Sequence, residues 1–362
     1  MKICIYAIAK NEAKFARRFM DACAAADYVT VLDTGSTDGT AETLRALGAI
    51  VKKRIIDPWR FDTARNAAMA LIPADTDVCV SLDIDEVLLP GWREALERAW
   101  AEGAELGEYT CVCSRASDGT AGTVFRREKL HARGAAEWIY PVHEVLRYTG
   151  AHKTPVRVSV PEMVCEHRPD ESKSRAQYLP LLQLAAEEKP NDPRCAHYLG
   201  RELMYHGRWR EAIAEFERHL GLATWKEERA ASLRYTSECL LSLGDRDAAL
   251  RRAIRSICEA DMRECWYEAE KVCYFRGDWE GVIYFGTEAL RRTARSESAI
   301  NEAEAWGAAV DDLLSLGYYY TGRIGEAIAH AKAALKLDEG NERIRKNLAL
   351  MRAAQEKRGG RR

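Results

Sequence analysis

The sequence predicts an α/β domain built on a parallel sheet, followed by an all-α domain of helical repeats. Over roughly the first ninety residues, short apolar runs alternate with segments whose apolar residues recur at helical spacing. That rhythm is typical of parallel strands joined by crossover helices. Beyond about residue 172, strand patterns nearly disappear and helical patterns repeat. A chain of 362 residues is also longer than one hydrophobic core usually supports. We therefore expect two domains and, from the change of pattern, place them at 1–172 and 173–362.

Polar segments follow the expected strands of the first domain. The expected strands are 2–9, 28–32, 50–56 and 78–82, and the helices between them are 12–26, 40–47 and 63–71. In parallel sheets, ligands bind beyond the carboxyl ends of the strands. Lys10–Glu12, Asp33–Asp38 and Asp83–Glu86 occupy those positions. From about 92 to 168 the pattern is less regular, and a helix followed by strand-like runs predicts an antiparallel addition to the sheet.

Two aspartates lie at the end of the fourth expected strand, in VCVSLDIDEVLL (78–89). If the chain stays extended through them, Asp83 and Asp85 point to the same face and Ile84 to the other. Neighbouring carboxylates repel, and Mg²⁺ or Mn²⁺ between them and an anionic ligand would offset that repulsion. The alternative is a solvated acidic turn.

The segment DTGSTDGT (33–40) follows the second expected strand. Asp33 and Asp38 offer acceptors there, and a helix beginning near Thr40 would aim backbone N–H groups at a ligand. A plain capped loop is the alternative. The chain contains neither GxGxxG nor GxxxxGK[ST], which argues against a dinucleotide fold and a P-loop.

A basic residue and two histidines complete the candidates from residue patterns. Arg65, in WRFDTARN, is either part of a structural ion pair or a phosphate ligand. His143 and His167 are the histidines nearest to other functional groups, and His167 is placed to become a further ligand of a cation. The other six histidines have no such context: His131, His152, His197, His206, His219 and His330.

The C-terminal half repeats a helix–turn–helix pattern. A turn glycine recurs at 207, 244, 277 and 322, in steps of 37, 33 and 45 residues, between helical runs. A period near 34 is the tetratricopeptide signature. We expect each glycine to end a helix in the left-handed conformation, an inserted loop near 295–301, and a capping helix at 338–354.

Composition limits the function further. The formal net charge of −2 argues against a phosphate-tracking protein. No apolar run reaches the length of a membrane-spanning helix, and the start lacks a signal-peptide pattern. Eleven scattered cysteines without a CxxC pair predict a reduced, cytoplasmic protein.

Taken in order, KNE, DTGSTDGT, ARN and DIDE resemble an inverting family 2 glycosyltransferase with the GT-A fold, a Rossmann-like nucleotide-diphospho-sugar transferase domain. Together with WRFDTARN, VHE at 142–144, His167 and the tetratricopeptide half, the chain is similar to the subgroup that includes glycocin-type S-glycosyltransferases. The resemblance covers nearly the whole chain. It is strongest over 1–90 and weakest over 92–140.

The resemblance implies how a UDP-type sugar donor would be held. Asp33 and Asp38 would contact the nucleoside, with Ala7 or Ala9 lining the base site. Arg65 would face the diphosphate or its surrounding acids, and Asp83 would reach ribose or sugar hydroxyls. The family usually has a second aspartate where this chain has Thr34, which leaves the base preference open.

The resemblance also implies a metal site and a general base. Asp85 would bind Mn²⁺ or Mg²⁺, His167 would complete the site, and Glu144 would be the general base, with Glu86 as the alternative. A single displacement at the anomeric carbon inverts its configuration.

The acceptor stays open at this point. The repeats favour a peptide or protein acceptor, or serve as a homodimerisation or stability module. The same chemistry on phage DNA bases or a surface glycan is an alternative, although the near-neutral charge disfavours nucleic acid. A further alternative is a non-catalytic scaffold that binds sugar nucleotides. The presence of acidic residues at 33, 38, 83 and 85 argues against this alternative.

Overall fold

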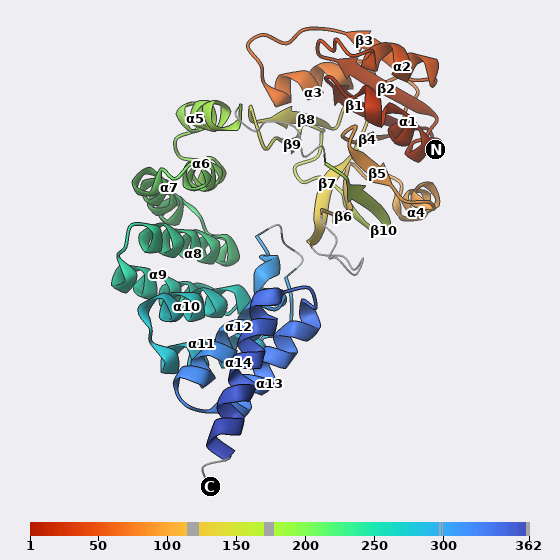
Figure 1. The fold of residues 1–362 in the computed structure, drawn as a ribbon. Coiled ribbons are helices and arrows are strands. Elements are labelled where there is room, and N and C mark those ends of the chain that lie inside the picture. Colours follow the sequence, from red (N-terminus) through yellow and green to blue (C-terminus); the bar gives the residue numbers. More distant parts are fainter. Residues whose placement is uncertain (114–122, 170–176, 297, 299, 360–362) are drawn as a thin grey trace. The chain divides into compact units, whose positions relative to one another are not determined.

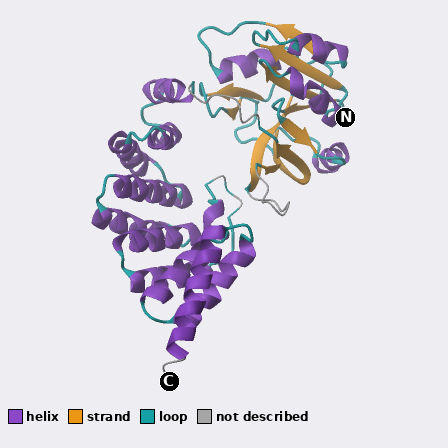
Figure 2. Cartoon of the chain, in the orientation of Figure 1, coloured by secondary structure: helices purple, strands orange, loops and turns teal. Residues whose placement is uncertain are grey.

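The computed structural model describes residues 1–113, 123–169, 177–296, 298 and 300–359 (Figure 1). The chain forms two compact units, which divide within α5 (Tyr178–Glu188) at Ala185. The boundary predicted at residue 172 lies outside the described residues. Strands occur in the first unit, and the described part of the second is helical (Figure 2). No helix among the described residues is long and apolar enough to cross a bilayer.

An eight-stranded sheet forms the first unit, in the order β3-β2-β1-β4-β7-β6-β10-β5. Its parallel half consists of β1 (Ile3–Ala9), β2 (Tyr28–Asp33), β3 (Ile50–Lys53) and β4 (Val78–Ser81). The added half consists of β5 (Glu86–Leu88), β6 (Leu106–Val112), β7 (Val124–Ala132) and β10 (Arg157–His167). Because β7 runs antiparallel to both β4 and β6, the predicted antiparallel addition is present. A separate pair, β8 (Ala136–Ile139) and β9 (Val145–Tyr148), forms a second small sheet.

Helices cover both faces of the parallel half. One face packs against α1 (Ala13–Ala22) and α2 (Thr40–Ala46), whose apolar side chains join those of Ile3 and Ile5 in one core cluster. The same cluster continues to α4 (Trp92–Ala99), which contacts β10 of the added half. The other face packs against α3 (Phe61–Met69) and β8, in a cluster that contains Cys4 and Tyr6. Successive side chains of β1 therefore enter opposite cores. This explains why the strand is apolar at nearly every position.

Helical hairpins form the second unit. The pairs are α6 (Pro193–Tyr205) with α7 (Trp209–Leu222), α8 (Lys226–Ser242) with α9 (Arg246–Glu259), α10 (Arg263–Arg276) with α11 (Trp279–Arg291), and α12 (Ala309–Tyr320) with α13 (Ile324–Leu337). A 3₁₀ helix at Ala303–Trp306 occupies part of the wide last step, and α14 (Glu342–Gly359) follows. The four turn glycines have φ of 69°, 84°, 72° and 82°, which confirms the predicted left-handed turns.

Close contacts explain why small and aromatic residues recur in these hairpins. A Cβ on Gly200 would lie 2.7 Å from a ring carbon of Phe216, so α6 and α7 approach each other only with glycine at that position. Trp279 stacks on Tyr320 of the next hairpin with ring centroids 4.2 Å apart. The predicted fold class, an α/β domain followed by an all-α tetratricopeptide-like domain, is confirmed.

Candidate functional site

The loops that follow β1 and β2 are joined by hydrogen bonds. Asn11 Oδ1 accepts a hydrogen bond from the backbone N–H of Thr37 at 2.8 Å, and the Asn11 N–H donates to Ser36 Oγ at 2.9 Å. Asn11 has a positive φ of 56°, a conformation that asparagine tolerates better than most residues. The KNE and DTGSTDGT segments therefore form one rigid rim at the carboxyl end of the parallel strands.

Asp33 is buried in this rim with one carboxylate oxygen unsatisfied. It lies opposite Ala9 in the parallel ladder, and its Oδ1 accepts from the N–H groups of Gly35 at 3.1 Å and Ser36 at 3.0 Å. Its Oδ2 is buried without a hydrogen-bond partner among the described residues. A buried acceptor without a donor is costly. This oxygen therefore suits a ligand that brings an N–H or O–H group.

Asp38, by contrast, uses its side chain to hold the loop. Its carboxylate accepts from the Thr40 N–H at 3.0 Å, the Ala13 N–H at 3.0 Å and the Thr40 hydroxyl. Partial burial opposes ionisation, but these hydrogen bonds outweigh it and lower the pKa of Asp38. The side chains of Ala7 and Ala9 are buried in the core beside α1. The predicted nucleoside contacts of these three residues stay predictions.

The chain does not remain extended through the acids after β4. The strand ends at Ser81, and the Glu86 N–H donates to the Asp83 carbonyl at 2.9 Å, which closes a turn. Ile84 is buried in the core within this turn. The expectation that Asp83 and Asp85 share one face of an extended strand is therefore wrong, because the chain reverses to pair β5 with β10.

Cationic side chains compensate the acids of this turn. Asp83 accepts from Arg65 Nη2 at 2.7 Å and from Lys129 Nζ at 2.8 Å. Fully buried Glu86 pairs with Arg127, contacts Lys129 Nζ at 3.3 Å, and accepts from the Asp83 N–H at 2.8 Å. Burial would raise the pKa of Asp83, but the nearby cations lower it well below its usual range. Asp83 and Glu86 therefore need no metal ion to offset their repulsion.

Two of these cations, Arg127 and Lys129, were not predicted from the sequence. Both lie on β7, and both side chains contact Glu86. The available signal was the charged run Arg126–Lys129 within a strand-like segment. It could be interpreted only once β7 was known to lie beside β4.

Arg65 is buried among acids. Its Nε donates to Glu144, its Nη2 to Asp83, and its Nη1 to Ser81 Oγ at 3.4 Å, while the guanidinium lies 5.1 Å from the centre of the Trp138 ring. Burial alone would lower the pKa of Arg65, but the two carboxylates raise it above the ordinary value. Of the two roles left open for Arg65, the structure favours the structural ion pair.

Glu144 and Glu86 differ in accessibility. The side chain of Glu144 is 11% exposed and that of Glu86 is 0% exposed. A general base must touch the acceptor whose proton it removes. Of the two candidates, only Glu144 presents surface for such a contact.

Asp85 and His167 lie together, beside the compensated acids. His167 Nε2 is 3.3 Å from Asp85 Oδ2, and the side chains of Asp85 and His167 are 17% and 33% exposed. The hydrogen bond to Asp85 raises the pKa of His167 above its usual value. A carboxylate oxygen and an imidazole nitrogen suit Mn²⁺, and ions of this type commonly use one or two protein ligands and take the rest from water and phosphate. The residues present therefore fit a divalent cation.

Residues 4–158 match the family model of glycosyl transferase family 2. The match runs from β1 into β10 and so contains the rim, the acidic turn and Glu144. It supports a glycosyltransferase domain in this part of the chain, as the motif order predicted. A search of curated proteins finds no match.

Solved structures that are similar to part of this chain include two that are described as TPR proteins. MamA has 17% identity and a TM-score of 0.37, with 44% of this chain and 86% of that chain covered. YrrB, described as a TPR protein with an unusual peptide-binding site, has 13% identity and a TM-score of 0.39, with 48% and 84% covered. A thermophilic TPR protein of Thermus thermophilus has 17% identity and a TM-score of 0.36, with 48% and 88% covered.

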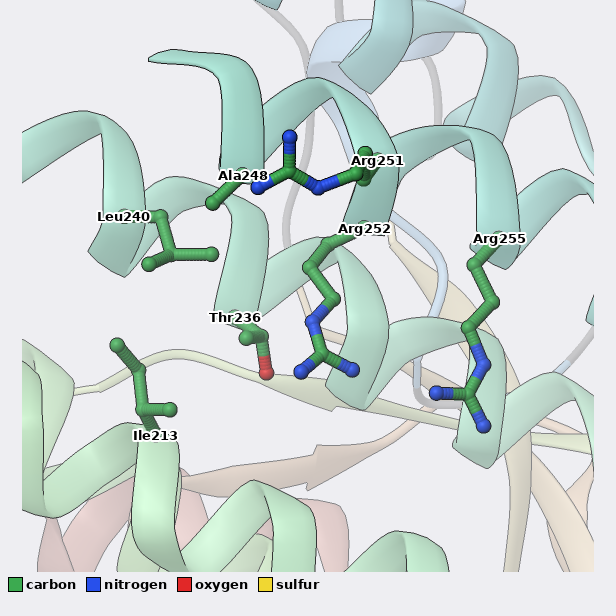
Figure 3. A pocket seen from close by; sticks show the side chains of 7 residues that line it. All are labelled: Ile213, Thr236, Leu240, Ala248, Arg251, Arg252 and Arg255. Carbon is green, nitrogen blue, oxygen red and sulfur yellow. The ribbon is translucent and has the colours of Figure 1, made fainter. Parts of the chain in front are cut away.

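The helical unit contains an arginine-lined pocket of its own. The cavity measures about 330 Å³ and is lined by Ile213 of α7, Thr236 and Leu240 of α8, and Ala248, Arg251, Arg252 and Arg255 of α9. Figure 3 shows the three guanidinium groups on the α9 side and the apolar side chains across from them. Arg252 is paired with Glu217 at 2.7 Å. Three cationic groups around one cavity favour an anionic ligand.

Proposed function

We propose that this protein is a metal-dependent inverting glycosyltransferase that moves a sugar from a UDP-type donor to a side chain of a peptide or protein. The observation that carries the proposal is the Asp85–His167 pair, 3.3 Å apart, at the carboxyl ends of the strands. Asp85 lies within the segment that matches glycosyl transferase family 2, and His167 lies beyond the end of that match at residue 158. Ligand binding at this edge is the rule for parallel sheets.

The proposal assigns donor binding to the rim and the turn. Asp33 Oδ2, which lacks a donor among the described residues, would accept a hydrogen bond from the nucleoside. Asp83 retains a 27% exposed side chain and would accept from ribose or sugar hydroxyls. A divalent cation held by Asp85 and His167 would compensate the negative charge of the leaving nucleoside diphosphate.

Glu144 would act as the general base. Arg65 holds Glu144 through Oε1, which fixes its orientation and leaves Oε2 to take the proton from the acceptor hydroxyl or thiol. The acceptor atom then bonds to the anomeric carbon as the bond to the diphosphate breaks on the opposite side, so the configuration inverts. The buried Arg65 thus acts as a positioning residue rather than as a phosphate ligand.

The acceptor is proposed to be a peptide or protein segment with acidic residues. The pocket on α7–α9 brings Arg251, Arg252 and Arg255 together, and carboxylates suit guanidinium groups through paired hydrogen bonds. Helical repeats commonly bind extended peptides on their surface.

A screen of nucleotide sugars tests the proposal. The purified full-length chain is expected to hydrolyse one UDP-sugar slowly with Mn²⁺ and to stop when EDTA is added. Glu144→Gln should retain donor binding and lose transfer, whereas an unchanged transfer rate would exclude Glu144 as the base. Binding of UDP without hydrolysis of any donor would instead favour the non-catalytic scaffold.

A further inference from the structure

Two histidines and a glutamate from three successive helices meet inside the helical unit. His197 lies on α6, His219 on α7 and Glu228 on α8. Each offers a ligand atom within 4.8 Å of those of the other two. Both histidines are buried, and the Glu228 side chain is 17% exposed. No role was predicted for either histidine from the sequence, because only the packing of the hairpins brings them together.

A serine orients both imidazole rings. Ser232 Oγ lies 2.9 Å from His197 Nδ1 and 2.9 Å from His219 Nδ1. A hydroxyl oxygen has two lone pairs and can accept from both Nδ1–H groups at once. In that arrangement each ring carries its proton on Nδ1, and each Nε2 presents a lone pair. Metal-binding histidines are commonly oriented through their second nitrogen in this way.

The two Nε2 atoms face different surroundings. His219 Nε2 lies 3.1 Å from Glu228 Oε2, close to the separation of two ligands on one tetrahedral ion, which is about 3.3 Å for metal–ligand bonds of about 2.0–2.1 Å. His197 Nε2 is buried and has no hydrogen-bond partner among the described residues. A buried nitrogen without a partner is uncommon in a folded protein.

We propose that His197, His219 and Glu228 form a binding site for a divalent transition-metal ion, best matched by Zn²⁺. Two imidazoles and one carboxylate are a ligand set that zinc accepts, with water in the fourth position. The ion would join α6, α7 and α8, and so fix the first hairpin of the helical unit onto the second. This site is a structural one, and it is independent of the function proposed for the first unit.

The surroundings keep the ligands in the form that binds metal. Burial lowers the pKa of His197 well below its usual value, and the electrostatic effects of Arg201, His219 and Arg194 lower it further. Metal ions bind neutral imidazole, so this depression favours coordination at neutral pH. The rings of Phe216 and Tyr235 pack near His197 and shield it from solvent.

The test measures zinc binding to the full chain after treatment with a chelator. The parent protein is the full chain with His167→Ala, and every variant carries this substitution too, so that the Asp85 site does not contribute. The chain is expected to retain one equivalent of zinc after gel filtration, to melt several degrees higher with zinc than with EDTA, and to give the visible absorption of tetrahedral cobalt when Co²⁺ replaces zinc. Glu228→Gln and His219→Gln should each lose the retained equivalent and the shift in melting temperature.

Control variants separate coordination from a general structural effect. His206→Gln, at the end of α6 and partly exposed beside Glu202, should bind zinc like the parent. Substitution of buried His219 can disturb folding. Glu228→Gln is therefore the deciding variant, because Glu228 is partly exposed and glutamine has nearly the same size as glutamate. Zinc retention by Glu228→Gln equal to that of the parent, or no retention by the parent itself, would overturn the proposal.

Discussion

Asp85 and His167 lie 3.3 Å apart because β5 and β10 run antiparallel at the edge of the sheet. His167 pairs with Glu86 in this ladder, and the Arg168 N–H donates to the Asp85 carbonyl at 2.9 Å. Asp83, two residues earlier, pairs instead with Arg65 and Lys129. The turn therefore separates an aspartate compensated by two cations from one whose side chain contacts a histidine. The two are expected to differ in function.

Asp33→Asn should weaken UDP binding while the fold persists. The substituted side chain can keep the hydrogen bonds from Gly35 and Ser36 through its amide oxygen, but it replaces the unsatisfied Oδ2 with a donor. Loss of a buried charged acceptor costs about 1–3 kcal/mol, or roughly 5- to 150-fold in affinity. Calorimetric titration with UDP measures it. The control is Asp38→Asn, which breaks hydrogen bonds within the loop. It should lower the melting temperature more than Asp33→Asn does, and lower the affinity for UDP less. The reverse pattern would contradict these roles.

Arg65→Met should strongly destabilise the first unit. It leaves the carboxylates of Asp83 and Glu144 without their shared partner in a buried site, and such a loss typically costs about 3–5 kcal/mol. Urea unfolding measures the change. The matched control is Arg98→Met, which breaks the exposed pair with Glu162 and should cost about 0–1 kcal/mol. If the two variants lost the same free energy of unfolding, the ion pairs of Arg65 would contribute no more to stability than the surface pair of Arg98.

Glu270→Gln should stabilise the helical unit at neutral pH. Glu270 is buried without a hydrogen-bond partner among the described residues, and burial, followed by Asp311 and Asp312, raises its pKa well above the usual value. Because the folded-state pKa exceeds the unfolded one, stability is fullest below about pH 4.3 and is lost as the pH rises through the folded-state pKa.

Unfolding of this variant across the pH range provides the check. Between roughly pH 5 and pH 8, the free energy of unfolding should fall in the native chain and fall less in Glu270→Gln. Glu326→Gln, at an exposed position of α13, should follow the native chain. If the free energy of unfolding changed with pH in the same way in the native chain and in Glu270→Gln, a raised pKa of buried Glu270 would be refuted.

Arg251→Glu combined with Arg255→Glu should weaken the binding of an acidic peptide. The change reverses two of the three charges around the pocket, so affinity for a polyglutamate-containing probe should fall at least tenfold and lose its dependence on salt. Fluorescence anisotropy measures both. Arg246→Glu, on the same helix but outside the pocket lining, is the control. An unchanged affinity in the double variant would exclude this pocket as the acceptor site.

Periodicity accounts for what could be predicted from the sequence. The apolar runs of β1, β2 and β4 and the turn glycines of the repeats are local signals, and the structure contains each element within a few residues of its predicted bounds. The carboxyl-edge rule then indicated where polar groups would gather. The order of motifs suggested the family of the first unit, which the match at 4–158 supports.

Long-range packing accounts for what could not be predicted. Arg127 and Lys129 compensate the acids only because β7 lies beside β4. The sequence predicted an antiparallel addition to the sheet, but no local pattern indicates which of its strands pairs with β4. The turn after Asp83 depends on the pairing of β5 with β10, which lies about eighty residues further along the chain. His197 and His219 meet only through the packing of successive helices.

Manganese titration of the native chain and of Asp85→Asn, with and without UDP, is the sharpest test of whether Asp85 binds a divalent cation together with the nucleotide. The native chain is expected to bind one Mn²⁺ much more tightly when UDP is present. Asp85→Asn is expected to lose this coupling, while a Glu162→Gln control retains it. Binding of Mn²⁺ and UDP to Asp85→Asn with the native affinity and coupling would contradict this expectation.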